Sequence, residues 1–473
     1  MGVVPLHGLS FDQIPEGVRQ VLRGLADFEA YLVGGCVRDA LLGRPPKDWD
    51  VVTSARPEEV MDRFDAVIPV GLRFGTVTVL AGDLPVEVTT FRRGGEPVAR
   101  PQAAAVSPGL LADLSGRDFT VNAMAWSPAA GLVDPFGGRA DLERRILRAV
   151  GDPVARFRED PLRMLRAIRF AATLGFAIHP DTWAAIRSCA AWIARVAVER
   201  VRDELNRILL SDRPAQGMTL LAESGLLRLI LPELEACRGF DQRNPHHHRD
   251  VFGHTLEVLD QVPAALHLRL AALLHDVGKP HTFTLDEQGV GHFYGHEKKG
   301  AELTAAILRR LRYSRELVAR VAHLVRHHMV PLQMGPRGRR RWVARVGAEH
   351  VEDLLALRRA DLGGRVRDDE LASLEALRQT LQEMQQAGVA NPAAALAVSG
   401  RDVMEALGIG PGPQVGKVLR RLREIIAEDP SLNRREVLLS LVREIARGEV
   451  AQEEGAQGEM AQGEKARGEA AQG

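Results

Sequence analysis

The chain has 473 residues, of which 45% are hydrophobic and 26% charged, and this composition excludes a wholly disordered or fibrous protein. Its 62 lysines and arginines balance 62 aspartates and glutamates, so nucleic-acid binding would have to come from local basic patches rather than from net charge. No apolar stretch approaches the roughly 20 residues that span a bilayer, and the first residues lack a signal-like pattern. We therefore expect a cytoplasmic protein without membrane contact.

Hydrophobic periodicity predicts an α+β fold with a mixed head and a helical body. Runs of β-branched residues such as 76–80 and 86–91 alternate with Gly/Pro turns up to about residue 150, whereas later apolar residues recur at helical spacing. Turn-rich segments then suggest the remaining boundaries. The expected parts are a head at 1–150, a helical neck at 151–240, a third domain at 245–365, a C-terminal helical domain at 370–447, and a solvated low-complexity tail at 448–473.

The head has its first distinctive pattern directly after a predicted strand, in the sequence GGCVRD at 34–39. The two glycines, Gly34 and Gly35, allow a ligand to approach the backbone closely. The amides that begin the following helix form an anion site that Arg38 can reinforce. This combination of strand, glycine turn and helix is typical of a site that holds phosphate groups.

A second pattern, KDWDVVT at 47–53, supplies acidic side chains. Asp48 and Asp50 are one residue apart, so in an extended segment both carboxylates point to the same face. They repel each other unless a cation lies between them, and Mg²⁺ is the natural occupant because it prefers oxygen ligands and substrate phosphates. Glu87, on the strand 86–88, is the expected third carboxylate. The head is thus predicted to hold a nucleoside triphosphate over two metal ions.

Four segments of the head resemble those of the class II tRNA nucleotidyltransferases and their relatives, the bacterial poly(A) polymerases: YLVGGCVRDALLG, KDWDVVT, VEVTTFR and DLSGRDFTVNAMA. The head of that family belongs to the DNA polymerase beta nucleotidyltransferase superfamily. The resemblance implies Mg²⁺ at Asp48 and Asp50, nucleotide contacts at Gly35 and Arg38, and a triphosphate contact at Arg117. Without the resemblance, Arg117 and the following aspartate would be interpreted as a local surface ion pair.

The segment FREDPLRMLRAIRF at 157–170 combines a helix start with a basic stripe. Asp160 suits a helix N-cap, and Arg163, Arg166 and Arg169 follow at steps of three. In isolation these arginines would be a solvated helix face. The segment also resembles the stretch by which the same family recognises the base. That resemblance implies that Asp160 and Arg163 imitate a Watson–Crick partner for C or A, while Arg166 and Arg169 contact phosphate or orient the pair.

Histidines gather between residues 246 and 328, around an adjacent His-Asp pair. A lone histidine is usually a surface or satisfied core residue, but this grouping has the donors that divalent metals accept. The arrangement resembles the HD phosphohydrolase superfamily, in which the H, HD and D positions correspond to His254, His275, Asp276 and Asp361. His296 and His327 are then expected at a second ion. The metal's identity stays open, as does the choice between a hydrolase acting on damaged RNA ends and a helical scaffold.

Taken together, the resemblance implies template-independent addition of C and/or A, with CCA as the leading expectation, to the 3′ end of tRNA from CTP and ATP. CC-only, A-only and poly(A) addition stay open, because the segment 92–112 lacks the acidic, aromatic loop that is usual in the family and is thought to help switch base specificity. Two enzyme alternatives are HD-type hydrolysis as the main activity and uridylylation of a signalling protein. A non-catalytic RNA chaperone is the remaining alternative.

The densest basic run, RGRRRW at 337–342, carries an aromatic residue. Such a run is either an RNA contact or a solvated helix face, and the sequence does not decide between them.

Overall fold

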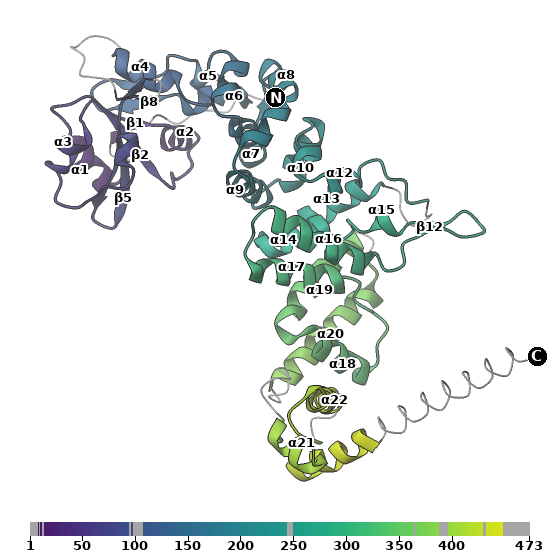
Figure 1. Cartoon of the computed structure of the whole chain (residues 1–473). Coiled ribbons are helices and arrows are strands. Elements are labelled where there is room, and N and C mark those ends of the chain that lie inside the picture. Colours follow the sequence, from purple (N-terminus) through teal and green to yellow (C-terminus); the bar gives the residue numbers. More distant parts are fainter. Residues whose placement is uncertain are drawn as a thin grey trace, which may run out of the picture. The chain divides into compact units, whose positions relative to one another are not determined.

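The computed structural model describes residues 8, 10, 11, 14–93, 96–97, 107–243, 249–363, 366–386, 396–428 and 432–447 (Figure 1). They form two compact units, residues 1–240 with 307–313 and residues 241–306 with 314–473. The predicted α+β class, with a mixed head followed by helices, is confirmed. The predicted tail at 448–473 and most of the segment 92–112 lie outside the described residues.

The head is built on a seven-stranded sheet with the strand order β3-β4-β5-β2-β1-β8-β9. Only β2 and β5 pair in parallel, and their register places Asp50 opposite Glu87. The other neighbouring strands of this sheet pair antiparallel. The strands are β1 (Ala30–Val33), β2 (Trp49–Thr53), β3 (Val67–Ile68), β4 (Thr76–Ala81), β5 (Leu84–Thr90), β8 (Ala125–Ser127) and β9 (Gly131–Val133).

The two faces of this sheet are covered differently. One face is apolar and buried, and α1 (Glu16–Gly24) and α3 (Pro57–Met61) contact its strands; its buried side chains include Trp49, Val51, Val77, Val79, Val86 and Val88. On the opposite face, α4 (Pro108–Ser115) packs on Val33, Val52 and Ala125, which lie in β1, β2 and β8. On the half of that face formed by β5, β4 and β3, Glu87, Leu80 and Ile68 are exposed, whereas Thr76 is buried. Asp50 and Glu87 therefore lie where the covered half meets the open half.

Short elements complete the head and helices form the neck. Helix α2 (Gly35–Leu41) follows β1 directly, and α7, which carries the predicted basic stripe, packs on α9 and α10. The remaining elements are β6 (Arg92–Arg93), β7 (Glu96–Pro97), α5 (Gly138–Arg144), β10 (Ile146–Leu147), α6 (Pro153–Glu159), α7 (Leu162–Leu174), β11 (Ala177–Ile178), α8 (Pro180–Cys189), α9 (Val198–Leu209), α10 (Pro214–Glu223), α11 (Leu227–Ile230) and α12 (Pro232–Glu235), with 3₁₀ turns η2 (Leu72–Phe74), η3 (Thr120–Asn122) and η4 (Ala190–Arg195).

Helices also dominate the rest of the chain, and within the described residues none is long and apolar enough to cross a membrane. A separate apolar core forms near the C-terminal end around Val403, Val418 and Leu422. The elements are α13 (Val251–Gln261), α14 (Leu266–Leu274), α15 (Lys279–Thr282), β12 (Thr284–Leu285), β13 (Gly291–His292), α16 (His296–Arg310), α17 (Arg315–His327), α18 (Pro336–Val346), α19 (Ala348–Leu362), α20 (Asp368–Gln386), α21 (Gly400–Leu407) and α22 (Pro413–Glu428).

The basic run at 337–342 lies in α18, which packs against α20. Trp342 is buried, Arg339 donates to the Thr380 hydroxyl at 3.1 Å, and Arg340 pairs with Glu383 at 3.6 Å. Part of this run therefore stabilises helix packing, and the predicted RNA contact stays a prediction.

A buried ion pair joins the head to the neck. Asp118, just before η3, accepts hydrogen bonds from the Phe119 amide at 2.9 Å, the Asn122 amide group at 3.1 Å and the Arg166 Nε at 2.7 Å. Burial alone would raise the pKa of this carboxyl, but the Arg166 guanidinium and the hydrogen bonds outweigh it and hold the pKa below its ordinary value of 3.8. The interaction fixes α7 of the neck against the head.

We expect Asp118→Asn to destabilise the protein by about 3 to 5 kcal/mol at pH 7, because it leaves the Arg166 charge without its buried partner. Since the folded pKa of Asp118 is lowered, this contribution is present above pH 3.8 and is lost as the pH falls through the folded value. Denaturant unfolding at pH 7 and in acid measures both effects. Glu143→Gln, which breaks the exposed pair with Arg139, is the control and should change stability by less than about 0.5 kcal/mol. Equal effects of the two substitutions would show that the Asp118–Arg166 pair stabilises the protein no more than an exposed pair does.

Candidate functional site

Three predicted carboxylates gather at the border of the open sheet face. Asp50 and Glu87 are opposite each other in the parallel pair β2–β5, so their side chains share one face. Asp48 immediately precedes β2 and is exposed. Both Glu87 and Asp48 act electrostatically on Asp50. The structure thus brings together the three residues that the sequence singled out.

The electrostatics of this group favour a bound cation. Burial, the Glu87 charge and the Asp48 charge raise the pKa of Asp50 to about 6, although Arg117 opposes them. A carboxylate that is destabilised by its neighbours gains most from a divalent ion, and the donors here are the oxygens that hard cations prefer. The residues present therefore fit a divalent metal. They are spread more widely than the histidine-rich group below, since among the described residues only that region brings three ligand atoms within 4.8 Å of one another.

On the β1 side of Asp50, a glycine makes room for an arginine. Gly34 has φ 76° and ψ −128°, and a Cβ built there would lie 2.6 Å from Arg117 Nη1 and 3.9 Å from Asp50 Oδ2. Arg117 also pairs with Asp113 at 3.2 Å. The alternative interpretation of Arg117 and Asp118 as a local ion pair is wrong, because Asp118 binds Arg166 instead. Arg117 therefore lies beside the carboxylates, where a phosphate chain would need positive charge.

Arg38 is buried behind this glycine turn. Its Nη1 donates to the Asn122 side chain at 2.7 Å, and its guanidinium pairs with Asp39 at 2.8 Å and lies 5.2 Å from the centre of the Phe170 ring. Gly35 begins α2 next to it, with Arg38 Nη2 3.7 Å from an added Cβ. Arg38 thus has protein partners on several sides, so in this structure it braces the turn.

The four predicted base-recognition residues extend from just before α7 to its middle, and each has a protein partner. The expected helix N-cap at Asp160 is wrong by one residue, because α7 begins at Leu162 and its N-cap is Pro161. Asp160 still accepts from the Leu162 amide at 3.1 Å. Arg163 donates to the Gly116 carbonyl at 2.8 Å. Asp160 also pairs with Arg200 at 2.8 Å, and Arg163 pairs with Glu159 at 3.0 Å. The sequence patterns had given neither Arg200 nor Glu159 a role.

The later arginines of the stripe form ion pairs with other parts of the protein. Arg166 binds Asp118, as described above, and Arg169 donates to the buried Glu204 at 2.7 Å. The solvated interpretation of the stripe is therefore wrong. Arg200 and Glu204 are four residues apart on α9, and this spacing is the signal that could have identified α9 as the partner of α7.

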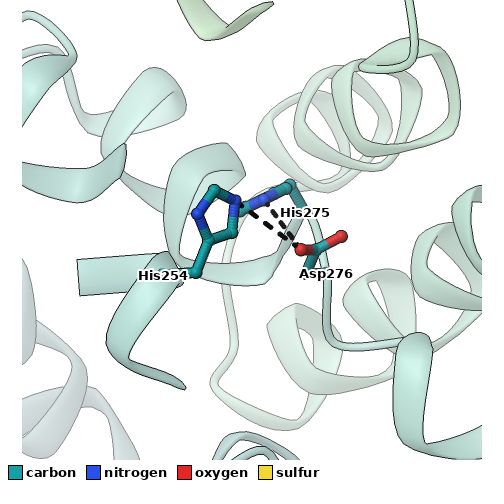
Figure 2. Close-up of side chains that lie close together, drawn as sticks. All are labelled: His254, His275 and Asp276. Carbon is teal, nitrogen blue, oxygen red and sulfur yellow. Dashed lines mark ion pairs between the residues drawn. The ribbon is translucent and has the colours of Figure 1, made fainter. Parts of the chain in front are cut away.

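In the second unit, α13, α14 and α19 bring together the predicted HD residues. His254 Nε2 lies 3.0 Å from Asp361 Oδ1, and His275 Nε2 lies 3.2 Å from Asp276 Oδ2 and 3.6 Å from Asp361 Oδ1. Figure 2 shows the His254 and His275 rings directed at the Asp276 carboxylate. Asp361, which is 107 residues from His254 in sequence, thus completes the group that spacing and similarity suggested.

A second group shares Asp276 but contains a different histidine from the one expected. Asp276, His296 and His328 have ligand atoms within 4.8 Å of one another. The His327 ring instead packs against His323, with ring centres 4.6 Å apart. His328, rather than His327, therefore faces the site.

Backbone carbonyls orient three of these imidazoles. The Nδ1 atoms of His275, His296 and His328 lie 2.9, 2.8 and 2.7 Å from the carbonyl oxygens of Ala272, Phe293 and Val325. Since a carbonyl oxygen only accepts, each Nδ1 carries a proton, and each Nε2 is the atom that either binds a cation or takes a second proton. His275 Nε2 is fully buried and faces the Asp276 and Asp361 carboxylates. This is the donor arrangement that a divalent metal requires.

The charges in this group point to the same conclusion. Burial would lower the pKa of His275, but Asp276 and Asp361 outweigh it and raise the pKa to about 10. Lys279 lies 2.7 Å from Asp276, and Arg358 lies 2.6 Å from Asp361. Two buried carboxylates that draw cationic groups so strongly also favour metal ions. The group lines a cavity of about 1010 Å³, which Arg249 and Tyr294 also line.

Three family models match successive parts of the chain, in the order of the head, the neck and the histidine-rich region. Residues 30–148 match the poly(A) polymerase head domain, residues 175–238 match the probable RNA and SrmB-binding site of polymerase A, and residues 247–364 match the HD domain.

Several proteins are similar over most of the chain. An A-adding tRNA nucleotidyltransferase of Deinococcus radiodurans is 40% identical over 84% of this chain and 91% of its own length. A CCA-adding enzyme of Limosilactobacillus fermentum is 32% identical over 89% of this chain and 94% of its own. The crystal structure of the Bacillus stearothermophilus CCA-adding enzyme in complex with CTP superposes with a TM-score of 0.71 at 30% identity, covering 92% of this chain and 98% of that one.

We expect Gly34→Ala to weaken ATP binding at least tenfold, because the added methyl group would displace the Arg117 guanidinium from beside Asp50. Gly131→Ala is the matched control, since Gly131 also has positive φ, 64°, but has no atom within 4 Å of an added Cβ. Calorimetric titration with ATP measures both, and equal affinities of the two variants would contradict the predicted role of Arg117.

For the second group, His328→Ala should remove at least one equivalent of tightly bound divalent metal, whereas His327→Ala should keep it. The adjacent histidines differ in direction and burial, since His328 is buried and faces the site while His327 is half-buried against His323. Metal analysis after dialysis distinguishes them, with circular dichroism as the check on folding. Loss of metal in the His327 variant alone would overturn the assignment.

Proposed function

Because the chain belongs to the tRNA nucleotidyltransferase family, which includes the A-adding and CCA-adding enzymes, we propose that it adds C and A to the 3′ end of tRNA from CTP and ATP. The observation that carries the proposal is the Asp48, Asp50 and Glu87 group, with Arg117 on one side and the base-recognition helix α7 held in the same unit. Since tRNA and these nucleotides are cytoplasmic molecules, the reaction is assigned to the cytoplasm.

In the proposed reaction, the RNA 3′-hydroxyl oxygen bonds to the α-phosphorus while the bond to the bridging oxygen of the leaving diphosphate breaks. Asp48, Asp50 and Glu87 are the proposed ligands of Mg²⁺, which when bound lowers the pKa of the hydroxyl and neutralises charge on the phosphates. Arg117, next to Gly34, binds the triphosphate. Arg38 keeps the turn at Gly34 and Gly35 in the shape that admits the phosphates.

Base selection is assigned to Asp160 and Arg163. Cytosine and adenine each present an amino donor beside a ring-nitrogen acceptor, which a carboxylate and a guanidinium can match, whereas uracil and guanine present a carbonyl in place of the amino group. A mismatch would leave buried polar groups unpaired, at a cost of about 1 to 3 kcal/mol each. In the structure Asp160 binds Arg200 and Arg163 binds Glu159, so an entering base replaces these surface partners. Arg166 and Arg169 orient the pair through Asp118 and Glu204.

The test is to incubate purified protein and Mg²⁺ with tRNAs that end before C74, before A76 or after A76, each with one labelled nucleoside triphosphate. We expect CMP on the first, AMP on the second, little addition to the third, and no UMP or GMP. Addition of AMP alone would identify an A-adding enzyme, the alternative raised by the Deinococcus radiodurans relative. UMP transfer to a protein, or no transfer at all, would contradict the proposal.

Asp50→Asn should lower kcat at least a thousandfold, because it removes a metal ligand at the reacting phosphate. Asp83→Asn, on the exposed turn between β4 and β5, is the matched control and should retain full activity. Undiminished transfer by the Asp50 variant would show that the carboxylate group is not the reaction centre.

A second function is favoured by the cavity of about 1010 Å³ in the other unit. We propose that its histidines and carboxylates hold divalent metal ions and that Arg249, Lys279 and Arg358 bind a phosphate ester at an RNA end. The metal, when bound, supplies an activated water. Hydrolysis of RNA ending in a 2′,3′-cyclic phosphate, assayed for His275→Ala and Asp50→Asn, tests this: only the first variant should lose it. Absence of hydrolysis in the unchanged protein with every divalent metal tried would leave a scaffold role.

A further inference from the structure

On the open face of the head sheet, the surface that extends from the carboxylates across β4 to β3 is apolar. The strand registers align Asp50 of β2 with Glu87 of β5, Glu87 with Thr78 of β4, and Thr78 with Ile68 of β3. These four side chains therefore form one row on the same face. Since strands are about 4.8 Å apart, the row extends about 10 Å beyond Glu87.

Exposed apolar side chains are concentrated at the far end of this row. Of the twelve large apolar residues exposed in the described chain, five lie between residues 68 and 80: Ile68, Val70, Leu72, Phe74 and Leu80. Ile68 is 42% and Leu80 38% exposed, and Leu80 is on the same face as Thr78 by alternation along β4. A monomeric protein rarely leaves so many apolar groups together unless they contact a partner.

The turn η2 bounds this surface and adds a positive charge. Gly71 packs on Thr76, which shares the open face, with an added Cβ only 3.3 Å from the Thr76 Cβ. Leu72 and the 68% exposed Phe74 lie in this turn, and between them Arg73 is also exposed. Flat apolar and aromatic groups beside a lone arginine suit the faces of nucleobases and a backbone phosphate, without preference for one base.

The two sides of Asp50 differ in what they can accept. Gly34 and Arg117 lie on the β1 side, which is covered by α4 and is positively charged. The β5 side is open and apolar. If the triphosphate occupies the charged side, the RNA whose 3′-hydroxyl attacks it must approach over the open side. About 10 Å of surface has room for about one or two nucleotides with their bases lying flat on it.

We propose that Ile68, Leu72, Phe74 and Leu80 form a stacking platform for the last unpaired nucleotides of the RNA acceptor, next to the reacting 3′-hydroxyl. This inference rests on the proposed function and assigns these residues as positioning residues. They act on the RNA and touch neither the triphosphate nor the metal ligands. The occupant is the RNA strand, because the surface is continuous with the row that holds Asp50 and Glu87.

The kinetic test compares the double variant Ile68→Ser/Leu80→Ser, here called the platform variant, with Leu229→Ser. Leu229, on α11, is a control position of similar exposure (44%). The platform variant should raise KM for tRNA about five- to tenfold while kcat and KM for ATP change less than twofold. Leu80→Phe alone should keep or lower the KM for tRNA relative to the unchanged protein, because an aromatic ring stacks better on a nucleobase than leucine does. The thermal unfolding midpoint is measured alongside, since all three positions are exposed and should not affect folding.

An activity-independent test uses tRNA with 4-thiouridine next to its 3′ end. Irradiation should link it to a peptide within residues 67–81, and the link should weaken in the platform variant. If the unchanged protein adds nucleotides but the variant keeps its KM for tRNA and the link forms elsewhere, for instance to a second copy of the chain, the platform is overturned while the proposed function stands. If the unchanged protein adds no nucleotide to any tRNA, the proposed function fails and the platform fails with it.

Discussion

The register between β2 and β5 is the constraint on which the candidate site depends. It forces the Asp50 and Glu87 carboxylates onto one sheet face, with Asp48 close enough to add its charge. Burial of Asp50 adds to the effect of the two neighbouring charges, so the group favours a divalent cation. The same row lies where α4 stops covering the sheet. One border thus separates a charged side, suited to phosphates, from an open apolar side, suited to an RNA strand.

Ion pairs between elements then fix the neck relative to this border. Arg166 on α7 reaches the buried Asp118 of the head, and Arg169 on the same helix reaches the buried Glu204 of α9. These buried pairs are costly to break and leave the half-buried Asp160 and Arg163, at the start of α7, in a defined position. A helix that selects a base by hydrogen bonds needs such a position, because an error of 1 Å would misalign donors and acceptors.

Alternation and motif spacing were sufficient to predict the α+β head, the helical body and the carboxylate group. The partner of Arg166 was not predictable, because Asp118 and Arg166 are 48 residues apart and only tertiary packing brings them together. The choice between His327 and His328 also depends on the exact rotation of α17, which sequence spacing does not fix to one residue. The apolar row ending at Ile68 required the strand order, which local patterns do not contain.

The most direct test of the central claim is the pKa of Asp50 itself, followed by carbon-13 NMR of labelled aspartate side chains, with Asp50→Asn used to assign the signal. We predict a titration midpoint near pH 6 without metal, because burial and the Glu87 and Asp48 charges raise the pKa to about 6. Saturating Mg²⁺ should move the midpoint below pH 4, since a bound cation stabilises the carboxylate. A midpoint near pH 4 that Mg²⁺ does not change would contradict the account.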